Sequence, residues 1–567
     1  MADKLAEYQR AGTPLPTHHR YWPLYGAGFE NLGREGQPAR TLLPRFGPDE
    51  LLVRHDAVGI CYSDIKVIKA GEAHPRIYRD MRTDPVVLGH EVGLTIVGVG
   101  ENLLAQFQVG ARFVVQADIY VDGVSRAYGY DLPGGFSQYN VIGAWVLNGD
   151  HGCYLIPVSP SMGYAESALT EPWACVEAAY NPQYRTQWKD GGLVWIVGEG
   201  QGVQLGEAAR WRPHHVLLNV GDAEFAAGIE AWGSKVAVEV HRGSPDPTWN
   251  EEAAFDDIIV LGANSDLVER AIPRLANGGV LNLVGAERLQ RPVRVDVGRL
   301  HYDHLTLVGT QGADLSNAYT PLRSQLKSGG LLWVLGAAGP MGHMHIQRAL
   351  EISDGPRKIV AVNLRRPRIR EVERRFSDLA KERGSELVCR SAEAFSPEQW
   401  DTWLRRQTEG KGFDDIVVLA PSVSAIEAAV AHLSLGGVLN LFAGLPRGTQ
   451  AALDLNLIGQ RGVRLFGTSG SSIDDLRHMR DLTESHTLSP NRSVAAVAGL
   501  EGVAAGLHAI AEGRFPGKVL IFPNIMPLPL TPLEALEDVL PSVFERLKDG
   551  REWTIEAERE FLRQMLP

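Results

Sequence analysis

The sequence FDDIIVL at residues 255–261 returns as FDDIVVL at residues 413–419, after an interval of 158 residues. Two more pairs repeat at this interval, GGVLNL at 278–283 and 436–441 and Gly-Thr at 309–310 and 467–468. Upstream, GGLVWIVGEG from Gly191 resembles GGLLWVLGAAG from Gly329, at an interval of 138 residues. One such pair can arise by chance, but three pairs at one interval indicate that a whole domain is duplicated.

Each copy alternates apolar runs with helical patterns. The runs are continuous, which is typical of strands in a parallel sheet that is buried on both faces. They predict strands at 193–197, 216–220, 258–261 and 280–284 in the first copy and at 331–335, 359–362, 416–419 and 438–442 in the second. A helical pattern such as 424–435 lies between strands. Repeated strand–helix units predict two tandem doubly wound, Rossmann-type domains of the α/β class, at residues 186–325 and 326–485.

The regions on either side of the duplication have different patterns. Short strands, such as 50–54 and 112–115, alternate with glycine and proline turns before residue 186 and predict a mostly β module. After residue 525 we expect two helical segments, at 531–548 and 555–565. The first would begin with Thr531 as N-cap and a proline at N1, and Pro541 would kink or split it.

Composition and charge exclude several classes of protein. The 567 residues are too many for one hydrophobic core, and 44% hydrophobic with 22% charged residues is ordinary globular composition. A formal net charge of −12 argues against binding to nucleic acid backbones. The four cysteines are too few and scattered for a disulfide framework. With no apolar segment of a secretory signal and no run of about 18 apolar residues, we expect a cytoplasmic protein without membrane contact.

Two short stretches carry side chains of the kind that bind zinc. GICYSD at residues 59–64 contains Cys61, and GHE at residues 89–91 contains His90 and Glu91. Thiolate, imidazole and carboxylate are preferred zinc ligands, and a catalytic zinc leaves one position open to polarise a substrate oxygen. Taken singly, a cysteine or a histidine–glutamate pair is more often part of a core or surface.

Each copy also has a glycine-rich turn after its first strand, where a pyrophosphate can approach the backbone and a helix N-terminus. The first copy has Gly198 and Gly200, but Val203 fills the third glycine position of GxGxxG. The second copy reads Gly336-Ala337-Ala338-Gly339-Pro340-Met341-Gly342. The sequence therefore predicts a nicotinamide dinucleotide site and leaves open which copy forms it.

The end of the second strand bears on the choice between NAD and NADP. In the second copy, Asn363 stands where an acidic residue normally accepts the ribose hydroxyls, and Arg365 and Arg366 come next in the chain. An arginine there can pair with a 2′-phosphate, as in NADP binding. Both arginines can equally belong to a solvated loop, so NAD and NADP both stay open.

Together these motifs resemble the zinc-containing medium-chain dehydrogenases, a family that includes alcohol, sorbitol and threonine dehydrogenases. The matching stretches occur in the family's order: GICYSD at 59–64, DPVVLGHE at 84–91, GGFSQY at 134–139 and TEP at 170–172. The resemblance covers roughly residues 40–525, with one Rossmann copy extra. It implies a GroES-like β-barrel catalytic domain at residues 1–185, a C-terminal return to that domain at 486–525, and a helical tail at 526–567.

The resemblance also implies roles for individual residues. Glu171 stands where alcohol dehydrogenases place a second cysteine and polyol dehydrogenases place a glutamate, so the polyol-type ligand set Cys61, His90, Glu91 and Glu171 is the better match. Glu91 would be a ligand or the immediate carboxylate neighbour of one. Cys175 is a candidate ligand only if the turn is shifted. Ser63 matches the family's proton-relaying hydroxyl, with Lys66 at the next relay position, and Asp64 would support the ligand loop.

The family's pattern bears on the number of zinc ions and on the cofactor site. Residues 92–152 contain no cysteine, so we expect one catalytic zinc and no structural zinc. The second copy leads into the expected C-terminal return, which favours it as the cofactor site. The first copy directly follows the catalytic module, so the opposite assignment stays open. Leu94 fills a position that is glycine in the family, so we expect the backbone there, but not the ligand set, to depart from the family's pattern.

The resulting interpretation is a zinc-dependent enzyme that transfers a hydride between a nicotinamide cofactor and an alcohol or ketone. The ligand set favours a polyol, a sugar or a sugar derivative as substrate. An epimerase or lyase with a tightly bound nicotinamide cofactor is the alternative, and a non-catalytic nucleotide sensor is a third. The family commonly forms dimers or tetramers, so we expect a homo-oligomer, with no nucleic acid or membrane partner.

Overall fold

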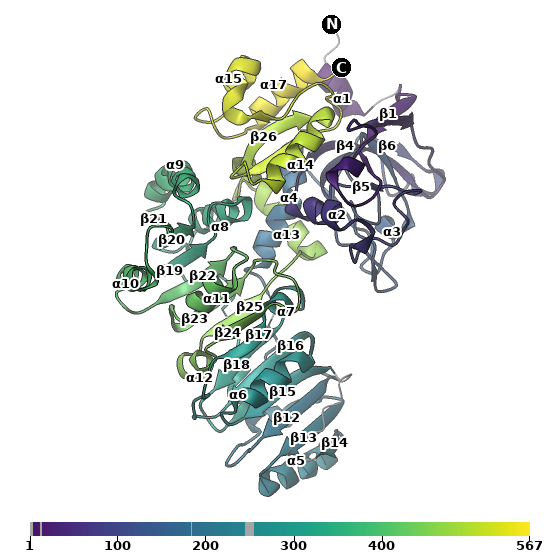
Figure 1. The fold of residues 1–567 in the computed structure, drawn as a ribbon. Coiled ribbons are helices and arrows are strands. Elements are labelled where there is room, and N and C mark those ends of the chain that lie inside the picture. The colour runs from purple at the N-terminus through teal and green to yellow at the C-terminus, as the bar shows by residue number, and fades with distance from the viewer. Residues whose placement is uncertain (1–3, 12–13, 183, 244–253, 322) are drawn as a thin grey trace. The chain divides into compact units, whose positions relative to one another are not determined.

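The computed structural model describes residues 4–11, 14–182, 184–243, 254–321 and 323–567, which fold into two compact units (Figure 1). The first, called here the eight-stranded unit, consists of Met1–Ala178, Gly339–Met344 and Gly470–Pro567. The second, the twelve-stranded unit, consists of Ala179–Ala338 and His345–Ser469. Most of both copies of the repeat thus lies in one compact unit, while Gly339–Met344 and residues 470–485, both expected in the second copy's domain, belong to the other.

The eight-stranded unit is built on a sheet that combines both ends of the chain. Its strand order is β11-β7-β6-β4-β27-β26-β28, with β10 also paired to β4. β27 runs antiparallel to β4 and pairs Leu520 with Gly59. The chain therefore returns, more than 400 residues later, to the strand that precedes Cys61. The strands are β4 (Leu51–Gly59), β6 (Glu91–Val99), β7 (Arg112–Val115), β10 (Tyr139–Ile142), β11 (Leu155–Pro157), β26 (Val494–Gly499), β27 (Lys518–Phe522) and β28 (Thr531–Pro532).

Helices cover this sheet and carry two of the predicted site segments. α2 (Tyr62–Ala70) starts directly after Cys61, and α4 (Tyr164–Ala178) packs against β4 and β6. α4 also packs on α13 (Ile473–Glu484), and α1 (Lys4–Arg10) contacts α17 (Ile555–Met565). Among the residues described, no helix is long and apolar enough to span a membrane.

The twelve-stranded unit has a single sheet made of two half-sheets. Their order is β14-β13-β12-β15-β16-β18 followed by β25-β23-β22-β19-β20-β21. Within each half all neighbours are parallel, and the halves join where β18 pairs antiparallel with β25. The first half-sheet contains β12 (Leu193–Gly198), β13 (His215–Val220), β14 (Glu239–Arg242), β15 (Phe255–Leu261), β16 (Leu275–Val284) and β18 (Thr306–Thr310). The second contains β19 (Leu331–Leu335), β20 (Lys358–Asn363), β21 (Glu386–Ser391), β22 (Phe413–Val418), β23 (Leu433–Leu441) and β25 (Arg464–Gly467).

The two half-sheets make matching contacts at repeated residues. In the first, Arg185 and Lys189 each lie 2.6 Å from Asp257 and Asp256, respectively. In the second, Arg323 lies 2.6 Å from Asp415 and Lys327 lies 2.7 Å from Asp414. In each half-sheet these ion pairs hold the segment before its first strand (β12 or β19) to the start of its fourth strand in chain order (β15 or β22). The Asp-Asp pair of the repeat therefore has the same structural task in both copies.

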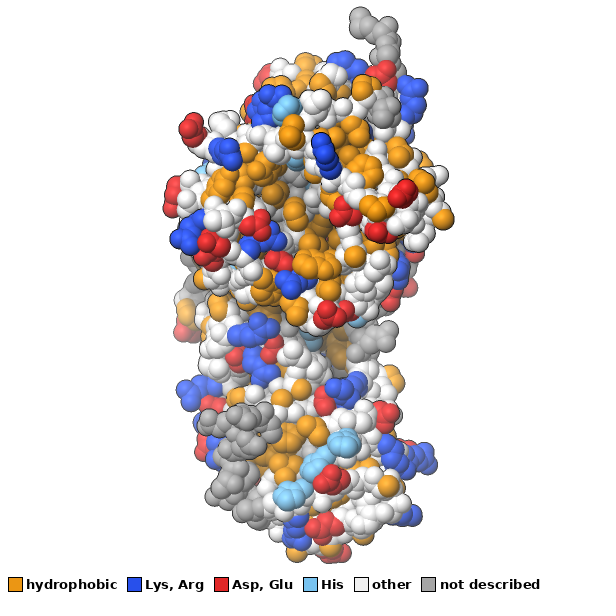
Figure 2. Space-filling model, turned by 90° about the vertical axis from the view of Figure 1, so that its right-hand side faces the viewer, with side chains coloured by type: hydrophobic (Ala, Val, Ile, Leu, Met, Phe, Trp, Pro, Cys, Tyr) orange, Lys and Arg blue, Asp and Glu red, His pale blue; other side chains and the backbone are white. Residues whose placement is uncertain are grey.

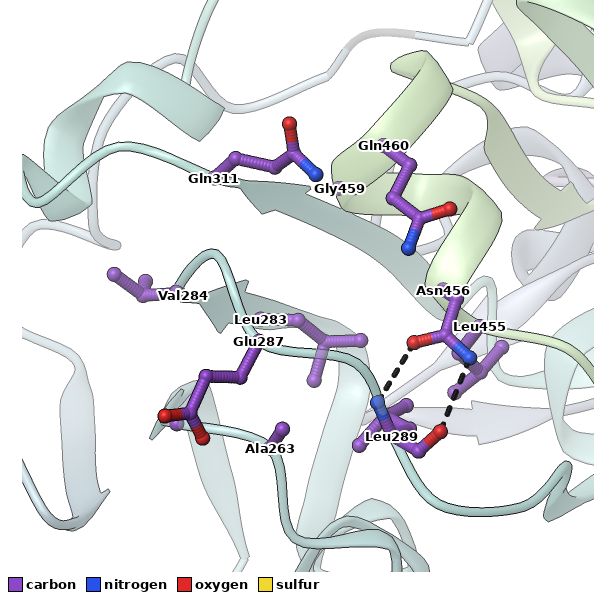
Figure 3. A pocket seen from close by; sticks show the side chains of 12 residues that line it. Ala263, Leu283, Val284, Glu287, Leu289, Gln311, Leu455, Asn456, Gly459 and Gln460 are labelled. Carbon is purple, nitrogen blue, oxygen red and sulfur yellow. Dashed lines mark hydrogen bonds between the residues drawn. The ribbon is translucent and has the colours of Figure 1, made fainter.

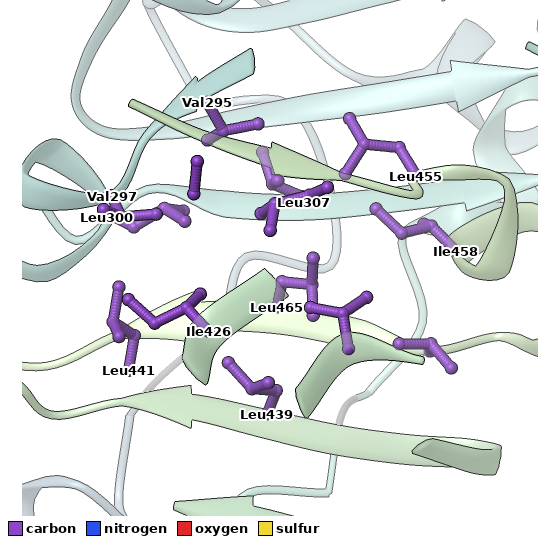
Figure 4. Close-up of a cluster of buried hydrophobic side chains, with 14 of the residues drawn as sticks. Val295, Val297, Leu300, Leu307, Ile426, Leu439, Leu441, Leu455, Ile458 and Leu465 are labelled. Atoms are coloured by element: carbon purple, nitrogen blue, oxygen red, sulfur yellow. The ribbon is translucent and has the colours of Figure 1, made fainter. Parts of the chain in front are cut away.

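A hydrophobic core crosses the joint between the half-sheets. Figure 4 shows buried side chains from both halves gathered in one cluster, among them Leu307 of β18 and Leu465 of β25, which pair directly. Leu307 is fully buried, and Leu465 is 1% exposed. The halves therefore share one core. The sheet is continuous because the inner edge strands of the two halves, β18 and β25, pair with each other.

The outer edge of the first half-sheet is polar. β14 has the sequence EVHR, and its Glu239, His241 and Arg242 are exposed. The rings of His215 and His241 lie 6.4 Å apart between centroids on neighbouring strands. Figure 2 shows histidine, acidic and basic side chains together toward the end of this unit drawn at the bottom. Charged groups on an edge strand oppose edge-to-edge pairing with another sheet.

The eight strands predicted in the two copies are confirmed, several with longer bounds. The helix predicted at 531–548 is wrong, because Thr531 and Pro532 form β28 beside β26 and only short turns of helix come after it. Pro541 does interrupt the segment, between α15 (Leu536–Val539) and α16 (Pro541–Phe544). The helical pattern 424–435 is shorter than expected: α11 (Val423–Val430) ends before β23, which begins at Leu433. The helix predicted at 555–565 is confirmed as α17.

Candidate active site

Cys61 occupies the junction between β4 and α2. Its backbone N–H donates to Asp64 Oδ2 at 2.9 Å, which fixes the first turn of α2. Ser63 Oγ lies 3.3 Å from Cys61 Sγ, and both residues are half-buried. Lys66, expected as the next relay position, is exposed on α2. The junction thus presents a thiol and a hydroxyl side by side.

His90 and Glu91 lie at the start of β6. Gly89 has φ of 95°, a conformation that favours glycine, and its carbonyl accepts the Gly135 N–H at 2.7 Å. β6 pairs with β4 so that Glu91 lies opposite Gly59. A Cβ at Gly59 would lie 2.0 Å from Glu91 Oε2, so the absence of a side chain at residue 59 makes room for this carboxylate.

The structure brings Cys61, His90 and Glu91 together. One ligand atom from each lies within 4.8 Å of the others, and His90 and Glu91 are 5% and 0% exposed. His90 Nδ1 lies 3.4 Å from Asp64 Oδ1. Glu91 Oε2 is buried without a hydrogen-bond partner among the described residues. A thiol, an imidazole and an unsatisfied buried carboxylate oxygen fit the coordination needs of one zinc ion.

Glu171 lies outside this three-residue cluster. It is 9% exposed on α4, and the thiol of Cys175, one turn later, approaches its Oε1 at 3.9 Å. Burial raises the pKa of Glu171 to about 7, the charge of His90 opposes the shift, and that of Glu91 adds to it. Glu171 therefore interacts electrostatically with the cluster, while the cluster itself contains neither Glu171 nor Cys175.

Lys518 is a site residue that the sequence motifs did not indicate. Its Nζ lies 2.5 Å from Glu91 Oε1, and its side chain is 4% exposed. Burial alone would lower the pKa of Lys518, but the charges of Glu91 and Cys61 raise it above its ordinary value. Lys518 begins the apolar strand β27, and a lysine directly before such a run is the one signal in the sequence. The ion pair compensates a carboxylate that would otherwise be buried alone.

The tail of the chain caps the helix that carries Glu171. The backbone N–H groups of Tyr164 and Ala165 donate to Glu558 of α17 at 2.6 and 2.7 Å. These N–H groups begin α4 and have no partner within the helix. Glu558 is 3% exposed, and burial raises its pKa to about 7 against the effect of the two backbone hydrogen bonds. The tail is therefore part of the support for α4.

The raised pKa of Glu558 predicts a pH-dependent effect of Glu558→Gln. An ordinary glutamate pKa is 4.5, so ionisation costs folding free energy that is absent below pH 4.5 and complete above about pH 7. Relative to the unsubstituted chain, the glutamine variant should therefore gain stability between pH 5 and pH 8, by roughly 1–3 kcal/mol. Urea unfolding at both pH values measures the change. A difference between the two proteins that does not vary with pH would contradict it.

The glycine-rich turn of the second copy leads into a full α-helix. Gly336, directly after β19, has φ of 91°, and the twelve-residue α8 (Pro340–Glu351) begins at Pro340. A Cβ at Gly336 would lie 2.7 Å from the Ala420 nitrogen, whereas one at Gly339 would meet no atom within 4 Å. The backbone at Gly339 is thus open to a ligand. Asn363 ends β20, and Arg365 is exposed at the N-cap of α9 (Arg366–Glu382).

The first copy has no α-helix between its glycine turn and β13, a segment that the structure describes throughout. Gly198 and Gly200 have φ of 122° and 79°, but β12 is followed only by a five-residue 3-10 helix, Gly206–Arg210. The turn is held by its neighbour instead, since Gln204 N–H donates to the Ala313 carbonyl at 2.9 Å. Of the two turns, the one in the second copy therefore offers the N-terminus of a longer helix, which a pyrophosphate requires in this kind of site.

Comparison with known proteins agrees with this architecture. A profile of the alcohol dehydrogenase GroES-like domain matches residues 47–148. The chain is 28% identical over 300 residues to mannitol-1-phosphate 5-dehydrogenase of Aliivibrio fischeri and 30% identical over 300 residues to YggP of Escherichia coli. Each match covers 48% of this chain and 70% of the relative. L-sorbose 1-phosphate reductase of Klebsiella pneumoniae is 27% identical over 299 residues, with 48% and 72% covered.

Solved structures show the same fold at low sequence identity. 2R,3R-butanediol dehydrogenase from Bacillus subtilis has a TM-score of 0.52 at 16% identity, covering 89% of this chain and 100% of its own. An alcohol dehydrogenase from Thermotoga maritima has a TM-score of 0.51 at 13% identity, covering 90% and 100%. The domain match and the relatives agree with the cluster of Cys61, His90 and Glu91. The chain therefore belongs to the zinc-type medium-chain alcohol and polyol dehydrogenase family.

Proposed function

We propose that this protein is a zinc-dependent, nicotinamide-linked dehydrogenase of polyols or sugar derivatives. The observation that carries the proposal is the convergence of Cys61, His90 and Glu91 within 4.8 Å. These residues would hold the metal, with Glu171 as a further carboxylate beside them. When bound, zinc supplies a Lewis acid that polarises the substrate oxygen.

The chain's own groups have distinct tasks in this proposal. Asp64 fixes the loop of Cys61 through the backbone N–H and lies against His90, so it orients two of the ligands. Lys518 balances the charge of Glu91 in a buried setting. Ser63 Oγ, next to the thiol, would relay the proton that leaves the substrate hydroxyl onward to solvent, and the nicotinamide would accept the hydride.

The relatives support a polyol or sugar phosphate as the substrate class. Three are named for phosphorylated compounds: mannitol-1-phosphate, L-sorbose 1-phosphate and arabitol phosphate. The arabitol-phosphate relative, from Enterococcus avium, is 30% identical over 211 residues, which cover 56% of its length. We infer that this chain acts on an alcohol of the same class.

The cofactor assignment rests on the second copy. Its glycine turn, Gly336 to Gly342, leads into a full α-helix, and the first copy's turn does not. Pro340 and Met341 would lie at the pyrophosphate, and Asn363 and Arg365 at the adenosine ribose. Arg365 would favour NADP over NAD if it pairs with a 2′-phosphate.

Removal of the metal tests this function. The purified protein should contain about one zinc per chain, since the described residues offer one cluster of this kind. A chelator should abolish the reduction of NAD or NADP by polyol phosphates, and added zinc should restore it. Metal analysis and absorbance at the reduced nicotinamide band measure both effects. Full turnover in a metal-free protein would reject zinc dependence.

A further inference from the structure

The joint between the half-sheets has an internal twofold relation. β18 and β25 pair Leu307 with Leu465, residues that occupy the same position of the repeat. Contacts across the joint are reciprocal. A Cβ on Gly309 would contact Ile458, and a Cβ on the equivalent Gly467 would contact Leu300, the counterpart of Ile458. β17 (Val293–Asp296) also pairs antiparallel with its counterpart β24 (Gln450–Leu453). Such reciprocity is the defining property of an isologous interface between two subunits.

We propose that the first copy acts as a built-in partner subunit, and that its residues Asp296–Asp303 position the cofactor-binding edge of the second copy. The inference rests on the proposed function, because it takes the second copy as the cofactor site. Ligands of doubly wound sheets bind at the carboxyl ends of the strands. The first copy touches the second at these ends.

α7 (Val297–Tyr302) of the first copy holds the end of β23. His301 is 6% exposed, and its Nδ1 lies 3.2 Å from the carbonyl oxygen of Leu441, the last residue of β23. Its ring centroid lies 6.4 Å from that of Phe442, which in turn lies 4.8 Å from the ring of His345 on α8. Packing thus connects α7 to the helix that comes after the glycine turn of the second copy.

Two carboxylates of the first copy hold the loop after β23. Asp303 Oδ1 lies 2.8 Å from Arg447 Nη2, while its other oxygen accepts from Arg299 Nε at 2.5 Å. Asp296 Oδ2 accepts the Gly448 N–H at 2.7 Å. Asp303 is 5% exposed while the Arg447 side chain is 59% exposed, so the carboxylate is held in place and solvent screens part of its attraction to the guanidinium. The position of loop 446–449 therefore depends on residues of the first copy.

The reciprocal contact on the first copy is built differently. Asn456 of α12 (Asn456–Arg461) accepts the Leu289 N–H at 2.7 Å and donates to the Leu289 carbonyl at 3.3 Å. Figure 3 shows this amide in a pocket that both copies line. An uncharged amide thus holds the loop in the copy whose glycine turn lacks an α-helix. Leu289 and Arg447 occupy the same position of the repeat, so the contact to each of these two loops can be removed separately.

Asp303→Asn and Arg447→Met, on the cofactor side, test the proposal against Asn456→Leu on the other side. With Asp303→Asn we expect the Kd of NADH or NADPH, from fluorescence titration, to rise roughly five- to tenfold, as for one lost charge-assisted hydrogen bond. The cofactor KM should rise equally, while kcat, the substrate KM and zinc content stay unchanged. Arg447→Met should have the same effect, and combining it with Asp303→Asn should raise the Kd little further. Asp303→Glu, which keeps the negative charge, should retain most of the cofactor affinity.

The test depends on a difference in cofactor affinity between the variants on the two sides of the joint. Asn456→Leu should leave the Kd of the cofactor unchanged. The proposal is overturned if Asn456→Leu weakens cofactor binding and Asp303→Asn does not, because the first copy would then hold the cofactor. It is also overturned if all variants bind the cofactor as the unsubstituted chain does. Failure of the unsubstituted chain to bind either nucleotide would instead reject the proposed function, and this inference with it.

Discussion

Replacing Cys61 by serine should remove the bound zinc and lower turnover by roughly a thousandfold or more, while the chain stays folded. The thiolate is the softest of the proposed ligands, and a serine hydroxyl binds zinc poorly at neutral pH. Loss of the Lewis acid withdraws several kcal/mol of transition-state stabilisation. Because Cys61 is a half-buried residue at a helix start, the substitution removes little packing. Metal analysis, steady-state kinetics and circular dichroism measure the three effects.

Cys153→Ser is the matched control. Cys153 is also half-buried in the eight-stranded unit, and its thiol approaches the Leu155 carbonyl at 3.8 Å, away from the metal cluster. This variant should keep its zinc and its turnover. A Cys61→Ser protein that binds a full equivalent of zinc and turns over normally would show that the thiol is no ligand. Loss of activity in both variants would point to general damage instead.

Two short motifs and the family they resemble were enough to predict that Cys61, His90 and Glu91 come together, although Glu171 lies outside the cluster that they form. Cys61 and His90 each lie in a short motif at the end or start of a strand, and pairing of β4 with β6 brings the motifs together. Lys518 and Glu558 could not be found in this way. They lie more than 350 residues from their partners Glu91 and Tyr164, so only the folded chain shows the contacts.

The same distinction applies to the fold. Continuous apolar runs predicted the strands of both copies, because burial on two faces is a property of each strand's own sequence. That the copies share one sheet depends on pairing between β18 and β25, more than 150 residues apart. Neither strand carries a sequence signal for its neighbour. The repeat therefore predicted two separate domains, and only the pairing of these strands shows one joined sheet.

Leu465→Asp should destabilise the whole twelve-stranded unit by about 4 kcal/mol or more. Leu465 is 1% exposed between β18 and β23, so the substitution removes core packing and buries a carboxylate without a partner. Leu307→Asp should cost a similar free energy, since Leu307 is the residue it pairs with and occupies the same place in the repeat. Leu435→Asp, at a position 78% exposed on β23, should change stability by less than about 0.5 kcal/mol.

Urea unfolding of the three variants separates a joined unit from two independent domains. If the halves share one core, each buried substitution weakens both, and all of the unit's β-structure unfolds earlier in one shifted transition. If the halves were independent, Leu465→Asp would unfold only the second and Leu307→Asp only the first, leaving half of the signal at its original midpoint. That biphasic result would contradict the shared core, and with it the reason that a change in the first copy is felt at the cofactor edge of the second.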